Sequence, residues 1–95
     1  MSNGATAGAA AAAAAMMKAV KASGVLVRIE PEDFRKLLDR QENPLVIASE
    51  AWVFGTQYRY LTPYRGLAFY AQSREPIHMP SRAEVVHSKK IWVPS

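Results

Sequence analysis

The hydrophobic and polar positions change their period along the chain, and the first segment has almost no polar positions. An alanine run from Ala9 to Ala15 is followed by lysines at 18 and 21. Alanine has the highest helix propensity, and the lysines suit the C-terminal end of a helix dipole, so we predict a helix from about Ala7 to Ser23. Isolated helices of this length are marginal in water, which leaves a mobile tail over residues 1–24 as the alternative.

A strand–helix–strand unit follows. Val25 to Ile29 predicts a short strand, Pro31 favours the start of a helix, and Leu45 to Ala48 predicts a buried strand. The helix between them has apolar residues at spacings of three and four, which are Phe34, Leu37 and Leu38. This helix should therefore pack one face against a sheet.

The stretch from Trp52 to Gln72 holds most of the aromatic residues and predicts a β-hairpin. Pro63 suits the second position of the turn, and Gly66 can take the positive φ that closes it. A bend or bulge is expected over 49–51, ahead of the hairpin. Apolar residues alternate on both sides of these strands, which indicates that both faces of the sheet are covered.

The last third of the chain predicts an irregular segment and one more strand. Pro76 and Pro80 make residues 73–83 irregular, with Ile77 and Met79 packed against the domain. Residues 84–93 form the last strand candidate, and its mixed lysines are typical of an edge strand.

These elements predict an α+β fold. An alanine-rich N-terminal helix, over residues 1–24, precedes a single small domain over 25–95 with the order β-α-β-β-β-β. Its sheet is mainly antiparallel, the second, third and fourth strands form the centre, and the helix that contains Phe34 packs on one face. The predicted core consists of Val25, Val27, Phe34, Leu37, Leu38, Val46, Ile47, Val53, Leu67, Phe69, Val86 and Trp92.

Composition limits the possible chemistry. The chain has 95 residues, a formal net charge of +4 and no cysteine, which excludes disulfides and thiolate chemistry. A chain without cysteine fits a reducing compartment, and we expect the cytoplasm. From Ala51 onward there are six basic and two acidic side chains, so the aromatic half is also the basic half. Such a half can attract phosphates or acidic proteins.

One possible binding surface combines basic residues with tyrosines of the hairpin. Its members are Tyr58, Arg59, Tyr60, Tyr64, Arg65, Tyr70, Arg74, Lys89 and Lys90. Arginines and lysines engage phosphates and exposed tyrosines stack on bases, which gives a nucleic-acid hypothesis. The alternative is that the tyrosines are half-buried strand residues. The run from Arg65 to Tyr70 also matches part of the RNA recognition octapeptide, but Leu67 and Gln72 replace its stacking aromatics.

No pattern of catalytic or metal-binding residues is present in the sequence. His78 and His87 are the only histidines, and no third ligand follows at a recognisable spacing. Glu50 and Glu84 would suit acid–base chemistry, but nothing in the sequence places them together. We therefore expect a protein without catalytic, cofactor-binding or metal-binding residues.

The hairpin sequence from Tyr60 to Phe69, together with the ending from Lys90 to Pro94, resembles small uncharacterised bacterial proteins that share both features. The resemblance covers most of residues 25–94 and implies no activity and no site.

Two functional expectations follow. The first is a non-catalytic protein–protein interaction or self-assembly module, because the core is thin and several strands are apolar on both faces. The alternative is a nucleic-acid-binding module that uses the basic, tyrosine-rich face. A small enzyme would require a concave pocket with convergent polar groups.

Overall fold

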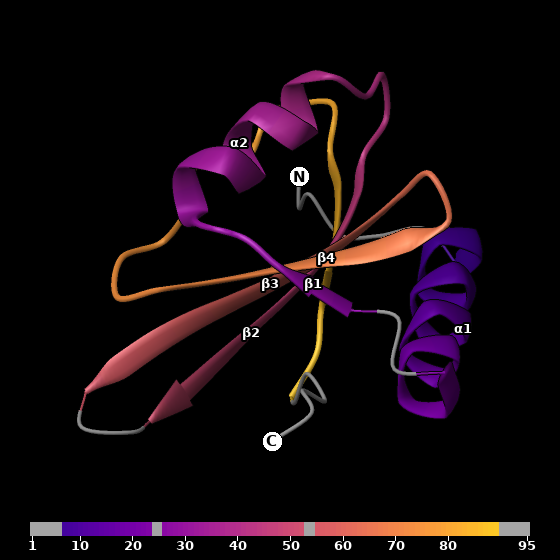
Figure 1. Cartoon of the computed structure of the whole chain (residues 1–95), viewed down its shortest axis with the longest axis horizontal. Helices are drawn as coiled ribbons and strands as arrows, with labels where there is room; N and C mark the ends of the chain where they lie inside the picture. Colours follow the sequence, from indigo (N-terminus) through magenta and orange to yellow (C-terminus); the bar gives the residue numbers. More distant parts are fainter. Residues whose placement is uncertain (1–6, 24–25, 53–54, 90–95) are drawn as a thin grey trace.

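The computed structural model describes residues 7–23, 26–52 and 55–89, and their five strands form one mixed sheet (Figure 1). The elements are α1 (Ala7–Ser23), β1 (Leu26–Arg28), α2 (Pro31–Asp39), β2 (Leu45–Trp52), β3 (Thr56–Tyr64), β4 (Leu67–Ser73) and β5 (Glu84–His87). The strand order is β1-β4-β3-β2-β5. The predicted α+β fold is confirmed, with an antiparallel β2–β3–β4 centre and an edge strand added in parallel on each side.

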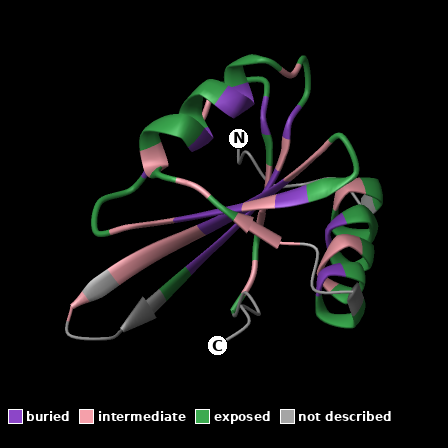
Figure 2. Ribbon diagram, viewed as in Figure 1, coloured by how far each residue is buried: buried purple, intermediate pink, exposed green. Residues whose placement is uncertain are grey.

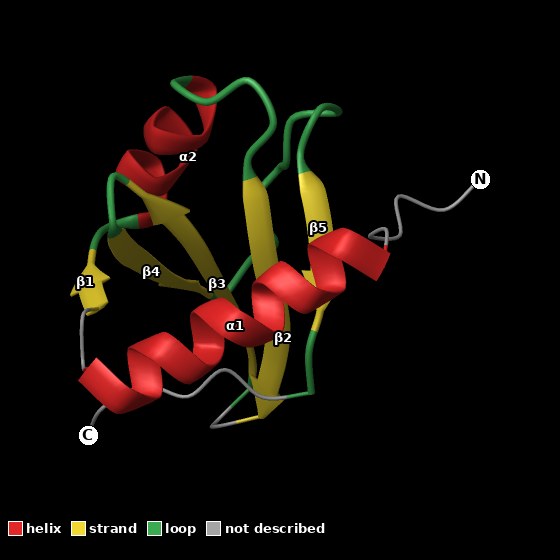
Figure 3. Cartoon of the chain, turned by 90° about the vertical axis from the view of Figure 1, so that its right-hand side faces the viewer, coloured by secondary structure: helices red, strands yellow, loops and turns green. Residues whose placement is uncertain are grey.

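The two helices cover opposite faces of the sheet. Helix α1 crosses one face over β2 and β5, and α2 packs on the other face against β4 (Figure 3). We call these the α1 face and the α2 face. Both helices have buried positions on the side turned to the sheet (Figure 2). The expectation that both faces are covered is therefore confirmed.

Each face has its own core. On the α2 face the buried residues are Phe34, Leu38, Val46, Ala48, Tyr60, Ala71, Ile77 and Ala83. On the α1 face they are Ala13, Val20, Ile47, Leu61, Ala68 and Tyr70. The split follows from the alternation of side chains along a strand, which sends neighbouring residues of β2, β3 and β4 to different layers.

The predicted core is right for the residues of α2 and β2 and wrong at the start of β4. The five confirmed members are Phe34, Leu37, Leu38, Val46 and Ile47. Leu67 is 40% exposed because it borders the turn, while its neighbour Ala68 is buried. Half-buried positions are held by Val27, Phe69 and Val86. The other three predicted members, Val25, Val53 and Trp92, lie outside the described residues.

The turn between β3 and β4 differs from the predicted one. Its two residues are Arg65 and Gly66, with φ values of 50° and 79°, between the paired Tyr64 and Leu67. Two positive φ values characterise the hairpin turns whose twist matches that of the strands. Pro63 is not part of the turn but lies inside β3, opposite Ala68 of β4. The turn was therefore predicted to begin two residues earlier than it does.

A side-chain hydroxyl compensates for the N–H that Pro63 lacks. The pairing of β3 with β2 ends at Leu61 and Ile47, and two residues further in the same register Pro63 comes opposite Leu45, whose backbone groups face β3. Proline cannot donate to the Leu45 carbonyl, and the buried Thr62 hydroxyl donates to it instead, at 2.7 Å. This contact explains how a proline is tolerated in a central strand.

Two further expectations are corrected. Strand β2 is continuous through residues 49–51 and keeps one register with β3, so the expected bend is absent there. Strand β5 ends at His87, earlier than predicted, and residues 90–93 lie outside the described part of the chain. The irregular segment over 74–83 is confirmed, with Ile77 buried and Met79 half-buried against the core.

Candidate functional site

A cleft of about 690 Å³ opens on the α2 face, beyond the part of the sheet that α2 covers. Its volume lies within the range of pockets that hold small ligands or side chains of a partner. Ala48 of β2 forms the floor, between its strand partners Tyr60 on β3 and His87 on β5. The hollow exists because a residue with a single methyl group stands between larger neighbours.

The irregular segment between β4 and β5 forms one wall of the cleft. Pro76, Ile77 and Met79 line it from this side. The Ile77 N–H donates to the Tyr60 hydroxyl at 2.9 Å, so a buried tyrosine on β3 holds the segment in place. The same contact satisfies a backbone donor that no strand pairs, since residues 74–83 form no strand.

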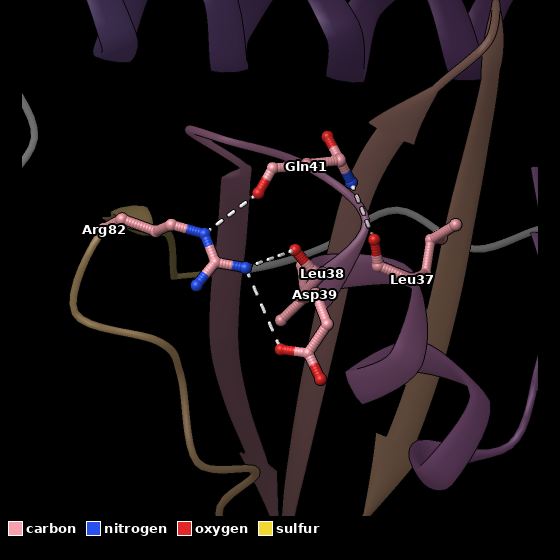
Figure 4. Close-up of polar contacts among 5 residues, drawn as sticks. All are labelled: Leu37, Leu38, Asp39, Gln41 and Arg82. Carbon is pink, nitrogen blue, oxygen red and sulfur yellow. Dashed lines mark hydrogen bonds and ion pairs between the residues drawn. The ribbon is translucent and has the colours of Figure 1, made fainter.

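The far end of this segment is fastened to the C-terminus of α2 by Arg82. Its Nε donates to the Gln41 carbonyl at 2.9 Å, and its terminal nitrogen donates to the Leu38 carbonyl at 3.2 Å (Figure 4). The same terminal nitrogen lies 3.8 Å from the Asp39 carboxylate. The last carbonyls of a helix lack partners within the helix, so the guanidinium caps α2 and fixes the segment at once.

Tyr60 connects the cleft to the core. Its ring packs against Phe34 of α2, with 6.0 Å between the ring centroids, and only 5% of the residue is exposed. Burial raises the pKa of the Tyr60 hydroxyl above its ordinary value, and the nearby Tyr58 and Glu50 act in the same direction. The hydrogen bond from Ile77 opposes this shift without reversing it. Tyr60 therefore stays a neutral hydroxyl at physiological pH.

The opening of the cleft carries polar side chains from three strands. Glu50 and Tyr58 are strand partners on β2 and β3, and His87 and Lys89 come from β5 and the residues after it. Glu50, His87 and Lys89 are exposed, and Tyr58 is half-buried. Groups of one acid and two basic residues around tyrosine rings can hold polar groups of a ligand while the rings bury its apolar part.

The cleft also borders an unpaired strand edge. The N–H groups of Glu84 and Ser88 donate to the carbonyls of Pro44 and Ala48, each at 2.9 Å. Successive residues of a strand direct their N–H and C=O groups to opposite sides, so the backbone groups of Val85 and His87 point away from β2. Among the described strands none pairs with that edge. The side chains of Val85 and His87 line the cleft, so the free edge and the cleft form one continuous surface.

The structure divides the predicted tyrosine and basic surface among several places. Tyr58, Tyr60 and Lys89 line the cleft, whereas Arg59 and Tyr70 belong to the α1 face. Two members meet at the β3–β4 turn, where the Arg65 guanidinium lies 5.3 Å from the centroid of the Tyr64 ring. Arg74 is exposed after β4, and Lys90 lies outside the described residues.

Other candidates remain apart. Glu50 lies on the α2 face, whereas Glu84 pairs with Leu45 of β2, five positions away and on the opposite face. His78 is exposed and does not line the cleft, unlike His87. Within the described ranges no three residues of the metal-binding types come together.

Sequence reasoning missed how the cleft is assembled. It predicted a strand from residue 84 onward and expected Ile77 and Met79 to be packed, and residues of both segments do meet at the cleft. The missing signal was Ala48, because a single alanine in an apolar run does not reveal that it forms a floor.

Comparison of the chain with protein-family models, with curated proteins and with solved structures finds no match in any of the three. The resemblance to small bacterial proteins therefore remains a prediction. Across residues 7–23, 26–52 and 55–89, neither helix has the length and apolar character that crossing a bilayer requires.

Proposed function

We propose that this protein is a non-catalytic protein–protein interaction module whose cleft receives an extended segment of a partner protein. The observation that carries the proposal is the position of the cleft beside the outer edge of β5. An extended peptide added to a sheet edge gains main-chain hydrogen bonds, and pockets for its alternate side chains give specificity.

The outward groups of Val85 and His87 supply the main-chain part of this interaction. Each residue offers one N–H and one C=O, so the edge suits a short segment of about four residues. Alternate side chains of that segment would point toward the α2 face, where Tyr58, Ile77 and Met79 surround the hollow above Ala48. We infer that the segment carries a large apolar or aromatic side chain at this position.

The partner can be another protein or a second copy of this chain. Two β5 edges related by a two-fold axis can pair with each other and extend the sheet across a dimer. The cleft would then be shared between the copies, which is the self-assembly form of the same proposal. The lack of cysteine fits a cytoplasmic setting for either form.

The substitution Val85→Pro tests the proposal. It removes an outward N–H that the β2–β5 pairing does not use, and prolines are tolerated on edge strands. Val85→Thr is the matched control, because it keeps the N–H and the branched side chain. The probe is a library of random ten-residue peptides displayed on phage, with light scattering to measure the oligomeric state.

We expect the wild-type chain and Val85→Thr to bind enriched peptides or to dimerise, and Val85→Pro to do neither while keeping the wild-type circular dichroism spectrum. A wild-type protein that stays monomeric and enriches no peptide would overturn the proposal. Binding that survives Val85→Pro would place the interaction away from β5 and overturn it as well.

The nucleic-acid alternative is less well supported. Tyr60 and Tyr70 are 5% and 1% exposed, so neither presents a ring face to a base. Tyr58 and Tyr64 remain half-buried on different parts of the hairpin. A titration with single-stranded RNA and DNA at low salt tests this alternative.

A further inference from the structure

Two arginines and three other polar residues form a strip on the α1 face, on the side of the sheet opposite the cleft. Its members, which we call the arginine strip, are Arg28, Gln57, Arg59, Tyr70 and Gln72. Arg28 pairs with Tyr70 across β1 and β4, and Arg59 pairs with Gln72 across β3 and β4. The Tyr70 ring lies in the core under α1, and its hydroxyl reaches the strip.

The neutral members of the strip are joined by hydrogen bonds. The Tyr70 hydroxyl donates to Gln72 Oε1 at 2.8 Å, and Gln72 Nε2 donates to Gln57 Oε1. Both side-chain carbonyl oxygens are thus engaged, and the Gln57 amide group lies at the end of the chain of bonds. Its NH₂ group remains as a donor.

The charged members also have donors to offer. Arg59 Nε is buried and has no hydrogen-bond partner among the described residues. The Arg28 guanidinium carbon lies 5.8 Å from the centroid of the Tyr70 ring. Burial raises the pKa of the Tyr70 hydroxyl, and the Arg59 and Arg28 guanidiniums partly oppose this rise, so both charges act on that hydroxyl. A buried donor without an acceptor is costly unless a ligand or water satisfies it.

The described helix and strands next to the arginine strip contain no acidic side chain on the α1 face, and Glu30 follows Arg28 by two residues in the connection to α2. Helix α1 and strands β1, β3 and β4 contain no acidic residue, and Glu50 of β2 lies on the other face. Glu84 of β5 pairs with Leu45, four residues along β2 from Ser49, which is the strand partner of Arg59. The ion pair found within the described residues, Arg82 with Asp39, belongs to the α2 side.

We propose that the arginine strip binds the phosphate-monoester dianion of a small molecule, with one guanidinium on each side of the phosphate. The Cα atoms of Arg28 and Arg59 are two strands and two residues apart, about 12 Å, which two arginine side chains can span together. Two fixed positive charges match a dianion better than a carboxylate, and guanidinium groups bind phosphate oxygens in pairs. A nucleic acid is a poorer occupant, because Tyr70 is 1% exposed and offers no face for base stacking.

Inorganic phosphate is the probe, and the side-chain Nε–Hε signals of the arginines in NMR spectra are the measurement. At constant ionic strength we expect a saturable shift at Arg28 and Arg59 and none at the exposed Arg74. The second pKa of inorganic phosphate is about 7, above the value near 6 of a phosphate monoester, so affinity for the probe should weaken as the pH falls below about 7. Arg59→Gln and Arg28→Gln should each weaken binding at least about tenfold, and Arg74→Gln should leave it unchanged.

Arg28 is exposed, so Arg28→Gln keeps the test valid if the half-buried Arg59 proves necessary for folding. Shifts that stay linear, or that are equal at Arg74, would overturn the site. Equal affinity for acetate would overturn the phosphate assignment, and much tighter binding of single-stranded DNA would favour nucleic acid over a small molecule. The strip and the cleft lie on opposite faces, so Val85→Pro leaves this test unaffected and the two proposals fail separately.

Discussion

The two faces of the sheet are covered by helices of opposite character. Helix α2 buries large side chains, and Phe34 and Leu38 are fully enclosed against Tyr60 and Val46. Helix α1 is mostly alanine and buries Ala13 and Val20 against the sheet, with Met16 and Met17 half-buried beside them. The α2 face is therefore stabilised mainly by a few large, fully buried side chains, whereas α1 packs through small or half-buried ones. The two faces of one sheet are thus covered by helices that pack in different ways.

The two helices also leave different parts of the sheet uncovered. On the α2 face, the helix is only nine residues long, and the cleft opens where its cover ends. On the α1 face, the long helix leaves a polar end that carries Arg28 and Arg59. The α2 face therefore offers shape and an apolar interior, and the α1 face offers charge.

The largest expected effect contrasts the main buried side chain of each helix. Phe34→Ala should lower the free energy of unfolding by about 3–5 kcal/mol, because it leaves a cavity against Tyr60. Val20→Ala on α1 removes fewer buried carbons and should cost roughly 2 kcal/mol. Urea denaturation of both variants measures the two values. Equal losses would show that the faces do not differ as described.

A smaller effect comes from adding volume to the α1 face. Ala13 is 3% exposed, so Ala13→Leu should cost about 1–3 kcal/mol by pushing α1 away from the sheet. Ala14→Leu is the control, since Ala14 is exposed and the change should stay within about 0.5 kcal/mol. Thermal and urea unfolding check both. If Ala13→Leu is neutral, close approach of the helix is not what holds α1 in place.

The composition of the two helices also explains how much of their packing can be predicted from the sequence. Spacings of three and four identify the buried side of α2, because Phe34, Leu37 and Leu38 stand out from polar neighbours. In α1 the spacings of three and four among Met16, Met17 and Val20 mark the side that meets the sheet, but the alanine run does not separate buried Ala13 from exposed Ala14. A pattern of residue types contains no information where all the residues are alike.

The remaining errors have local causes. A Pro–x–x–Gly spacing suggested a turn at Pro63, but the turn uses Arg65 at φ 50°. Arginine rarely adopts a positive φ, so its presence in a sequence does not indicate such a turn. The antiparallel centre was predictable from alternating residues in the hairpin. The cleft was not, since it requires the irregular segment to be held over the sheet by Tyr60 and Arg82, and no periodic pattern records such contacts.

A third prediction tests the tyrosine that links the cleft to the core. Tyr60→Phe keeps the ring against Phe34 but removes the oxygen that accepts the Ile77 N–H, which should cost about 1–2 kcal/mol. The cleft admits water to the released N–H, so the loss should fall short of that for a fully sealed donor. Faster amide exchange at Ile77 measures the local effect, and an unchanged exchange rate would show that Tyr60 does not hold the segment.

The smallest effect appears only at alkaline pH and contrasts the charges around the two buried tyrosines. Burial raises the pKa of Tyr60 and of Tyr70 above the ordinary value. The unfolded chain ionises its tyrosines near pH 10, so the stability from the neutral hydroxyls is fully present below about pH 10 and is lost as the pH rises further. Glu50 raises the pKa of Tyr60, whereas Arg28 lowers that of Tyr70.

Removing these two charges should therefore change the alkaline loss in opposite directions. Glu50→Gln lowers the pKa of Tyr60 and should make stability fall less steeply above about pH 10, while Arg28→Gln should make it fall more steeply. Arg74→Gln, at an exposed position after β4, is the charge-matched control for Arg28→Gln and should leave the slope unchanged. Urea unfolding at a series of alkaline pH values measures the slopes. Shifts of Glu50→Gln and Arg28→Gln in the same direction would mean that the two faces do not hold their tyrosines in opposite electrostatic surroundings.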